Sequence, residues 1–377
     1  MLPYGRQLVE EDDVQAVAKA LRSDWLTTGP EVERFERRLA EAVGARYVVA
    51  VNSGTAALHA AYFAAGVGPG DEVITSPITF AATANAALYL GARPVFADIE
   101  EETNNVDPTA IEQMITPRTK VLAPVDFAGH PADLDAIREL ARRRGLVVVE
   151  DAAHALGALH HGRKVGSLSD MTVFSFHPVK HITTGEGGAV ATNDEQYYRR
   201  VKAFRNHGIV READELLENH GPWYYEMHAL GYNYRLTDFQ CALGISQLGK
   251  LDWFLERRRE IVRRYQAAFA DLSGVKVPVE RPEARSAWHL YVLRLSGGAR
   301  KRLAVFERLR GRGLGVQVHY IPVYWHPYYR RLGYAKGLCP RAEAYYDGCL
   351  SLPLYPAMTD PDVERVIEEV RCAVMEV

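Results

Sequence analysis

Two periods of hydrophobic and polar positions alternate along the first two thirds of the chain. Phe35, Leu39 and Val43 recur at four-residue spacing, which predicts a helix over 31–43 opened by Gly29-Pro30. We expect further helices over 55–65 and 132–144, and short buried strands over 47–51, 72–75, 94–97, 121–125, 146–149, 171–176 and 189–192. This rhythm is typical of βαβ units, so we predict an α/β fold whose mostly parallel, mixed sheet is covered by helices on both faces.

The pattern changes after about Ala242. A long amphipathic stretch reaches Ala270, and the positions beyond it predict strands over 275–279, 289–295 and 315–320 and helices over 301–312 and 361–374. We therefore expect a large domain over 1–245 and a smaller α+β domain over 246–377. The segment 205–234 is polar and aromatic with little periodicity, which favours a functional or interface loop.

Composition and charge exclude several classes of protein. The 377 residues carry 45 Lys and Arg against 48 Asp and Glu, a net charge of −3, so the chain lacks the basic character of a general nucleic-acid binder. The four cysteines show no C-x-x-C spacing, which argues against a disulfide framework and a structural zinc site. We find no signal peptide and no apolar run long enough for a membrane helix, and therefore expect a cytoplasmic protein.

Three segments resemble nucleotide-binding or metal-binding motifs but do not match them. The glycines of 66–70 precede a strand instead of following one, so a plain turn is favoured over a dinucleotide loop. The segment 157–164 spaces two glycines like a phosphate loop, but no Ser or Thr follows Lys164. His160 and His161 have no carboxylate or cysteine at metal-binding spacing, so we interpret them as surface histidines and expect no metal site.

Two charged residues at strand ends form the first part of a candidate site. The apolar run 147–149 is followed by Glu150 and Asp151, and an acid at the carboxyl end of a parallel strand points into the crevice where ligands bind. A helix cap or a metal ligand is the more ordinary interpretation of such an acid. Lys180 follows the strand 171–176 in a segment free of other charge until Glu186, and apolar surroundings favour the free amine that attacks a carbonyl.

The third part is the segment 52–57, which lies between a strand and an alanine-rich helix. Free N–H groups at a helix start attract a phosphate, although Ser53 or Thr55 could instead be an ordinary N-cap. A lysine that forms a Schiff base, an acid that keeps a pyridine nitrogen protonated and a helix start that holds a phosphate are the parts required by pyridoxal 5′-phosphate (PLP). The sequence therefore predicts PLP as the cofactor.

With these parts in place, the chain resembles the DegT/DnrJ/EryC1/StrS family of sugar-nucleotide aminotransferases, which have the fold-type I aminotransferase scaffold. The resemblance covers nearly the whole chain. It rests on the segments 25–30, 52–57, 77–85, 150–157, 174–188, 231–236, 317–320 and 350–353. Within the family, the segments 125–129, 243–248 and 317–322 are most similar to the transaminase of the pseudaminic-acid pathway, which forms UDP-4-amino-4,6-dideoxy-N-acetyl-β-L-altrosamine.

The resemblance implies a role for each matching residue. Lys180 would carry the cofactor and move the proton, Asp151 would pair with the pyridinium nitrogen, and Phe80 would stack on the ring. Gly54, Thr55 and Ser175 would hold the phosphate. His154 would lie near the ring, with a core histidine as an equal alternative, and Asn233 would reach the phosphate of the neighbouring subunit. The implied residues of the sugar-nucleotide site are Tyr4, Asp24, Trp25, Leu26, Thr27, Gln317, Val318, His319 and Tyr320.

The resemblance also implies an activity. An amino group would pass from L-glutamate to C4 of a nucleotide-linked 4-keto-6-deoxy sugar, UDP-linked by comparison with the pseudaminic-acid branch, in a homodimer with shared active sites. Another sugar-modifying chemistry on the same fold is a rival, but relatives that dehydrate sugars have histidine where Lys180 stands. A non-catalytic regulatory protein is a second rival, and it would not need Lys180. A nucleotide-binding oxidoreductase ranks last because no Rossmann fingerprint is present.

Overall fold

The computed structural model describes residues 1–377, and a seven-stranded sheet organises its larger part. The strand order is β2-β10-β9-β6-β5-β3-β4, in which β10 is antiparallel to both neighbours and every other pair is parallel. The predicted mixed, mostly parallel sheet is therefore confirmed. Its strands are β2 (Tyr47–Val51), β3 (Glu72–Thr75), β4 (Arg93–Phe96), β5 (Thr119–Ala123), β6 (Val147–Asp151), β9 (Met171–Ser175) and β10 (Gly188–Thr192).

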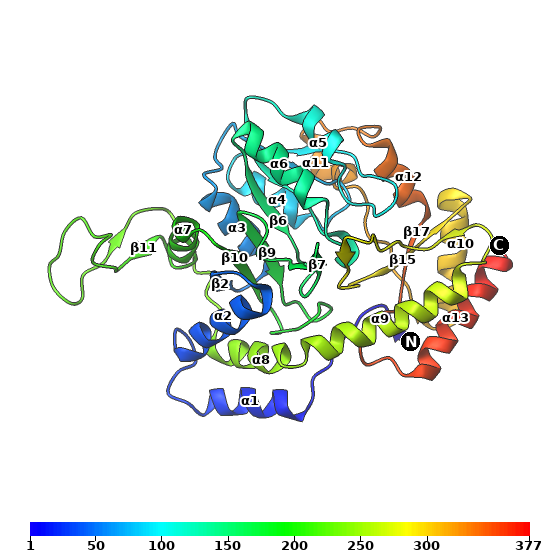
Figure 1. The fold of residues 1–377 in the computed structure, drawn as a ribbon, viewed down its shortest axis with the longest axis horizontal. Helices are drawn as coiled ribbons and strands as arrows, with labels where there is room; N and C mark the ends of the chain where they lie inside the picture. Colours follow the sequence, from blue (N-terminus) through cyan, green and yellow to red (C-terminus); the bar gives the residue numbers. More distant parts are fainter.

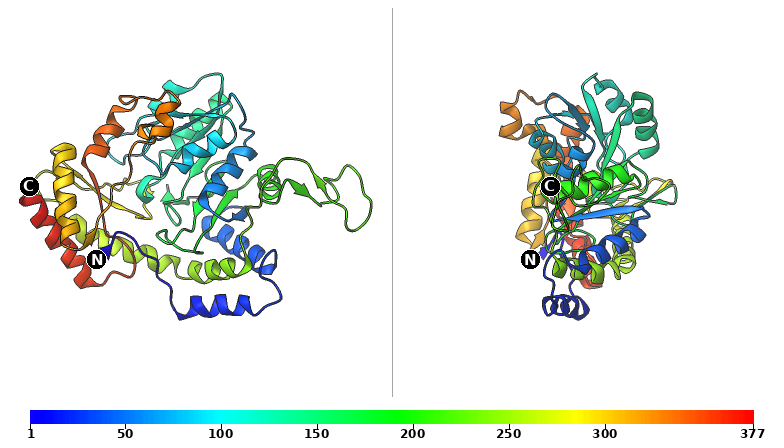
Figure 2. Two further views of the ribbon diagram at one scale, coloured as in Figure 1. Left: turned by 180° about the vertical axis from the view of Figure 1, so that it is seen from behind. Right: turned by 90° about the vertical axis from the view of Figure 1, so that its left-hand side faces the viewer.

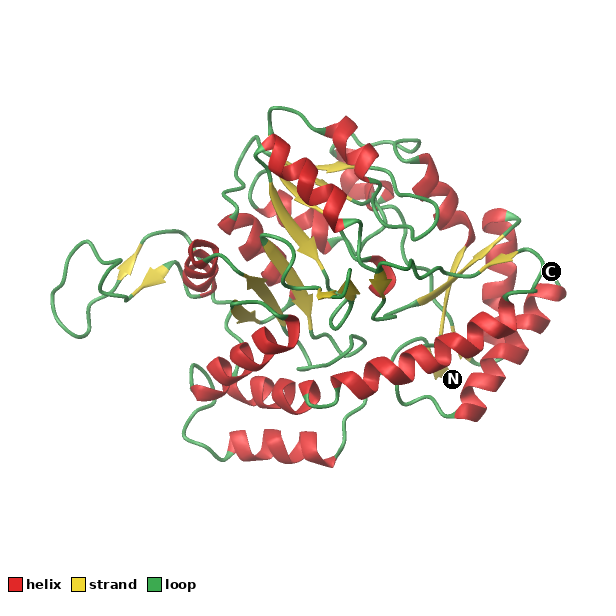
Figure 3. Ribbon diagram, in the orientation of Figure 1, coloured by secondary structure: helices red, strands yellow, loops and turns green.

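Helices cover this sheet on both faces (Figures 1 and 3). The alanine-rich α3 contributes seven buried residues to one apolar cluster, because small side chains let the helix lie close to the strands. Val43, Leu39 and Phe35 of α2 belong to another cluster, as their four-residue spacing predicts. The helices of this part are α1 (Glu11–Leu21), α2 (Pro30–Val43), α3 (Gly54–Ala64), α4 (Ala82–Tyr89), α5 (Pro108–Met114), α6 (Leu134–Arg144), α7 (Glu195–Arg205) and α8 (Asp238–Leu248), with the 3-10 turn η1 (Phe127–Gly129).

The C-terminal part is built on the three-stranded sheet β13-β15-β17. The long helix α9 (Leu251–Phe269) begins against the cluster of α2 and ends in the apolar cluster of this second sheet. Figure 1 shows α9 running from α8 towards α10 and α13, near which both chain termini lie. The other elements are β13 (Val275–Lys276), β15 (Tyr291–Leu295), α10 (Gly298–Gly311), η2 (Val323–Trp325), α11 (Pro327–Arg331), α12 (Pro340–Gly348), β17 (Cys349–Leu352) and α13 (Asp360–Met375).

The expected change of domain after residue 245 falls inside α8. We keep the division into 1–245 and 246–377 as a proposal. No helix of the chain combines the length and the apolar character that crossing a membrane requires.

The strand expected over 315–320 is largely absent from the structure. Of the expected strand 315–320, only Gly315 lies in a strand, the two-residue β16 (Leu314–Gly315), which pairs in parallel with β1 (Leu2–Pro3). Gln317 makes one isolated bridge to Ser351, and the rest runs as a loop. The alternation of Val316, Val318 and Tyr320 therefore reflects a loop with buried and half-buried side chains, because no strand pairs along its length.

The segment 205–234 forms an arm that extends from the body of the molecule. It holds the short hairpin β11 (Ile209–Val210) and β12 (Glu226–Met227), and Figures 1 and 2 show it projecting beyond α7. Leu217, Trp223 and Leu230 on this arm are all largely exposed. Apolar side chains on a projecting arm favour contact with another protein surface.

Candidate functional site

Asp151 ends β6 and is held in place by two hydrogen bonds. Thr83 of α4 donates its hydroxyl to Oδ2 at 2.7 Å, and the N–H of Ala153 donates to Oδ1 at 3.1 Å. Burial raises the pKa of the Asp151 carboxyl, and the nearby Lys180 opposes that rise. The carboxyl is therefore fixed in orientation and ready to pair with a cationic partner.

Two further carboxyls, those of Asp126 and Glu150, belong to residues next to Asp151. Asp126 and Glu150 are both fully buried, and burial is the main cause that raises the pKa of both groups. Glu150 accepts hydrogen bonds from Ser169 at 3.0 Å and Thr172 at 2.8 Å, so it is the better placed of the two to hold the charge. We infer that Asp126 is the protonated member of the pair, which keeps the net charge next to Asp151 low.

Lys180 lies in the turn that follows β9. Its backbone N–H donates to the carbonyl of His177 at 2.8 Å, and its amine donates no hydrogen bond within the chain. Desolvation lowers the pKa of the amine to about 8, while the Asp151 carboxylate acts in the opposite direction. With a pKa of about 8, about a tenth of Lys180 is the neutral nucleophile at pH 7, far more than for an ordinary lysine, and a Schiff-base lysine reacts in this form.

The predicted phosphate site lies where α3 begins. The Ser53 side chain caps the N–H of Ala56 at 3.0 Å, which leaves the N–H groups of Gly54 and Thr55 without an intrahelical acceptor. A Cβ on Gly54 would lie 3.0 Å from the Cβ of Ser175, so any larger residue would crowd the place where the helix start meets the end of β9. The structure thus brings Gly54, Thr55 and Ser175 together, although they are far apart in sequence.

His154 faces the site from the loop after β6. Its Nε2 lies 3.3 Å from the hydroxyl of Tyr320, its ring is 4.3 Å from that of His289, and its Nδ1 is buried without a partner. Burial lowers the pKa of His154 well below its ordinary value, so the imidazole is neutral. An unpartnered buried nitrogen favours the interpretation of His154 as a site residue over that of a satisfied core histidine.

Phe80 lies at the mouth of this region. Its side chain is 64% exposed, and its ring centroid is 6.4 Å from that of Tyr320. A large apolar ring left open beside Tyr320 is available to stack on a flat ligand.

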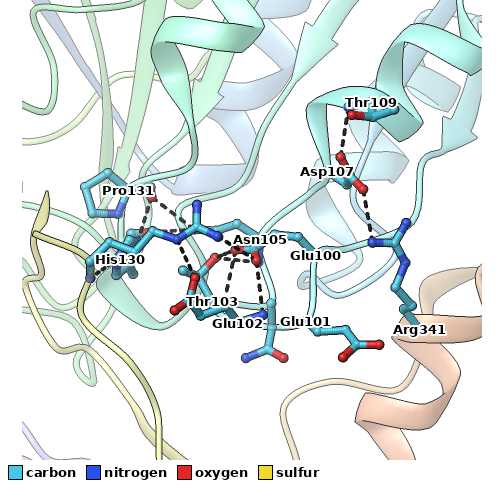
Figure 4. A network of polar contacts seen from close by, with 12 residues as sticks. Glu100, Glu101, Glu102, Thr103, Asn105, Asp107, Thr109, His130, Pro131 and Arg341 are labelled. Atoms are coloured by element: carbon cyan, nitrogen blue, oxygen red, sulfur yellow. Dashed lines mark hydrogen bonds and ion pairs between the residues drawn. The ribbon is translucent and has the colours of Figure 1, made fainter. Parts of the chain in front are cut away.

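Polar contacts fix the loop that carries Phe127, whose ring is 6.3 Å from those of His154 and Tyr320. Asn105 accepts a hydrogen bond from the N–H of Phe127 at 2.8 Å. It donates its amide to the carbonyls of His130 at 3.0 Å and Pro131 at 3.1 Å (Figure 4). These bonds tie the loop after β4 to the loop after β5, so Asn105 positions one wall of the site from outside it.

The N-terminal segment and the loop after β16 meet near Tyr320. The ring of Tyr4 lies 5.2 Å from that of His319, whose Nδ1 is 2.8 Å from the hydroxyl of Ser351. Val318 is half-buried next to them, whereas Gln317 points to an exposed position. Four of the predicted substrate residues on these two segments are thus neighbours of the His154 region.

The other predicted residues stand apart from Lys180 in this single chain. Asp24, Trp25, Leu26 and Thr27 are exposed between α1 and α2, and Thr27 forms a bridge with Thr237 before α8. Asn233 is exposed at the base of the arm, where it bridges to Asn206. No hydrogen bond or ion pair links any of them to Asp151 or Lys180.

A groove of about 1120 Å³ lies elsewhere, between α2, α7 and β2. Its lining includes Arg199, Arg205 and Arg235 together with carboxylates such as Glu36, with which Arg205 forms an ion pair at 2.5 Å. Neither Lys180 nor Asp151 lines it. We therefore assign the chemistry to the Asp151–Lys180 region despite the size of this groove.

The fold and this site are those of a PLP-dependent aminotransferase, and comparison with known proteins defines the family. The chain matches the DegT/DnrJ/EryC1/StrS aminotransferase family over residues 7–371 and belongs to it. It is 46% identical over 374 residues to the spore coat polysaccharide biosynthesis protein SpsC of Bacillus subtilis (strain 168), with 98% of this chain and 96% of SpsC covered.

Solved structures agree with this assignment. The PMP form of Spr1654 from Streptococcus pneumoniae, described as a sugar aminotransferase, matches with a TM-score of 0.94 and 33% identity over 100% of both chains. Helicobacter pylori PseC, an aminotransferase involved in the biosynthesis of pseudoaminic acid, matches with a TM-score of 0.93 and 32% identity, again over 100% of both chains. A PLP form of Spr1654 matches as well.

The residues of this chain fit the cofactor. A side chain on Gly54 would crowd Ser175 at the start of α3, so the structure keeps this approach to the free N–H groups open. The orphaned Nδ1 of His154 and the open face of Phe80 lie in the region of Asp151 and Lys180. PLP, when bound, supplies an electron-accepting pyridinium ring and an aldehyde carbon that exchanges amines.

Sequence reasoning missed three contributors to this region. His289 precedes β15, and only the tertiary fold brings it against His154. Arg258 of α9 is buried and donates to the carbonyls of Trp288 and His289, each at 3.3 Å, which holds that segment in place. Asn105 lies in an ordinary polar loop, and no signal in the sequence marks it.

Proposed function

We propose that this aminotransferase moves the amino group of L-glutamate to C4 of a nucleotide-linked 4-keto-6-deoxy sugar, and that the nucleotide is UDP. The observation that carries the proposal is the Asp151–Lys180 pair beside the start of α3, with Tyr4, His319 and Tyr320 next to it. The likeness to PseC and to the protein described as the sugar aminotransferase Spr1654 supports a sugar acceptor. The test is whether the enzyme forms an aminated product from a keto-sugar nucleotide and L-glutamate.

In this proposal, four groups of the chain divide the work. The Asp151 carboxylate stabilises a positive charge on the cofactor nitrogen, and the N–H groups of Gly54 and Thr55 bind its phosphate. The neutral amine of Lys180 accepts the proton from the donor carbon and returns it to the acceptor side. Remote contacts to the nucleotide would hold the ketone in position while this proton moves.

The buried pair Asp126 and Glu150 supports the role of Asp151 as the residue that carries the negative charge. A carboxylate that binds a cation must stay ionised. A second negative charge beside it would raise its pKa and so favour the protonated form. Burial and the neighbouring Glu150 raise the pKa of Asp126, which favours its neutral form and lets Asp151 keep its own charge for the cofactor. A regulatory protein that only binds would have no need for this arrangement or for the lowered pKa of Lys180.

The lowered pKa of Lys180 predicts how cofactor capture depends on pH. Only the neutral amine attacks the aldehyde, so the rate at which apoenzyme takes up PLP should rise with pH and level off above a midpoint near 8, the pKa of about 8 of this amine. Stopped-flow recording of the yellow absorbance across the pH range measures this rate. A midpoint near the ordinary pKa of lysine would contradict the desolvated environment that we describe.

Tyr320 should separate the two half-reactions. We expect Tyr320→Ala to slow amine transfer to the sugar by roughly 10–100-fold while the glutamate half-reaction stays within about threefold, because its ring borders the acceptor side. Absorbance changes of the loaded enzyme record each half separately. Tyr320→Phe keeps the ring and is the matched control. Equal loss in both halves would instead make Tyr320 a support of the cofactor or the fold.

The shared-site proposal predicts rescue in mixed dimers. Lys180→Ala chains and Asn233→Ala chains should each be inactive or weak. In a mixed dimer, the intact Lys180 of one chain would meet the intact Asn233 of the other, so random mixing should restore about a quarter of the wild-type activity. Subunit exchange is verified by native mass spectrometry. Stable mixed dimers without any recovered activity would refute sharing through Asn233.

A further inference from the structure

The structure corrects the interpretation of His160 and His161 as an isolated surface pair. His160 is buried, and Asp135 of α6 lies next to both imidazoles although it precedes them by a long stretch of chain. We propose that Asp135, His160 and His161 form a binding site for a divalent transition-metal ion, Zn²⁺ in the first instance. The site is built by residues outside the proposed active site and does not depend on the proposed function.

The spacing of the three side chains fits a metal ion. Oδ2 of Asp135 is 3.3 Å from Nε2 of His160 and 3.5 Å from Nε2 of His161. Ligand atoms about 2.1 Å from a tetrahedral Zn²⁺ are about 3.4 Å apart, so both separations match. All three ligand atoms lie within 4.8 Å of one another, and the exposed His161 ring can turn to close the remaining distance.

The local backbone directs both histidines to the same carboxylate. His160 ends β7 (Leu159–His160), and His161 lies in the turn before β8 (Arg163–Lys164). Neighbouring residues of a strand point to opposite faces, but His161 has a φ of 47°, in the left-handed region, which breaks that alternation. Its N–H donates to the carbonyl of Glu283 at 2.7 Å, so a third segment stabilises this conformation.

The charges around the site leave the carboxylate free for a cation. Arg163 lies opposite His160 in the hairpin, but it is exposed and forms no ion pair with Asp135 or with any other carboxylate. Oδ1 of Asp135 makes no hydrogen bond within the chain, so it can act as a further ligand. Two imidazoles and one carboxylate suit Zn²⁺, Ni²⁺ or Cu²⁺ better than Mg²⁺ or Ca²⁺, which prefer oxygen ligands alone.

Metal binding would fasten the β7–β8 hairpin to the first turn of α6. The hairpin continues the loop that carries His154, and β7 also pairs with β14 (Ala284–Arg285) before the segment of His289. A bound ion would therefore stabilise the outer layer of this region without touching Asp151 or Lys180. Any binding energy adds to the stability of the folded state by mass action.

The test is a calorimetric titration of cofactor-loaded enzyme, free of any histidine tag, with Zn²⁺. We expect one Zn²⁺ per chain with a Kd in the micromolar range and a rise in Tm when Zn²⁺ is present. Asp135→Asn and His161→Asn should each weaken binding at least about tenfold. Asparagine is chosen at position 161 because it accepts the left-handed backbone.

His220→Asn is the matched control. His220 is 61% exposed and pairs with Glu218 at 2.9 Å, much as His161 is 59% exposed beside Asp135, but it has no second histidine. This variant should bind Zn²⁺ like the wild type. The proposal is overturned if the wild type shows no saturable Zn²⁺ binding, or if Asp135→Asn and His161→Asn bind as tightly as the wild type. Circular dichroism verifies that each variant is folded.

Discussion

Lys180→Ala is expected to abolish transamination, with a loss of at least about 10⁴-fold in kcat. The variant loses both the amine that holds the cofactor and the group that moves the proton, so no other side chain replaces it. It should still bind the phosphate of the cofactor, because Gly54, Thr55 and Ser175 are untouched. Steady-state turnover with glutamate measures the loss, and equilibrium dialysis measures the retained binding.

Lys120→Ala is the control for this substitution, since Lys120 is an exposed lysine on β5 and should leave activity unchanged. A Lys180→Ala enzyme that transaminates at the wild-type rate would remove the assignment. An enzyme that is inactive and also fails to bind PLP would assign Lys180 a larger share of cofactor affinity than the phosphate site.

Asp151→Asn should lower kcat by roughly 10²–10³-fold, or about 3–4 kcal/mol of transition-state stabilisation. The amide has nearly the same shape as the carboxyl but carries no charge, so it cannot stabilise the protonated ring nitrogen on which the electron sink depends. Single-turnover reaction with glutamate measures the effect on the chemical step.

Thr83→Val provides a graded comparison. It removes the hydroxyl that donates to Asp151 at 2.7 Å while leaving the charge in place, so the loss should be smaller, about tenfold. An Asp151→Asn enzyme that is no slower than Thr83→Val would show that the charge of Asp151 contributes little.

The fold could be predicted from the sequence wherever one period dominates a segment. Buried parallel strands are continuous apolar runs, and for this reason 47–51 and 72–75 agree residue for residue with β2 and β3. The prediction of a strand over 315–320 was wrong, because alternation of apolar and polar residues does not by itself supply a strand to pair with. Whether a segment forms a strand therefore depends on the strands beside it in the fold, and the local sequence pattern does not reveal these.

The candidate site could be predicted only in part, for a related reason. Asp151 ends one strand and Lys180 follows the neighbouring parallel strand of the same sheet, and topology alone brings such positions to one edge. Thr83, which orients Asp151, lies in the matching segment 77–85, but nothing in the sequence assigns its hydroxyl to Asp151. His289, which packs on His154, comes from a distant segment without a motif. The same holds for Asp135 beside His160, whose approach depends on how α6 packs against the hairpin.

The proposed function is tested most directly by following the amino nitrogen of L-glutamate to the acceptor. Enzyme is incubated with ¹⁵N-labelled L-glutamate and, in separate reactions, with UDP- and dTDP-linked 4-keto-6-deoxy sugars, and the products are analysed by mass spectrometry. We expect ¹⁵N at C4 of a UDP-linked sugar, together with 2-oxoglutarate in equal amount. Transfer of ¹⁵N to free keto acids, and to no keto-sugar nucleotide, would contradict the proposed acceptor and leave only the PLP chemistry of Lys180 and Asp151.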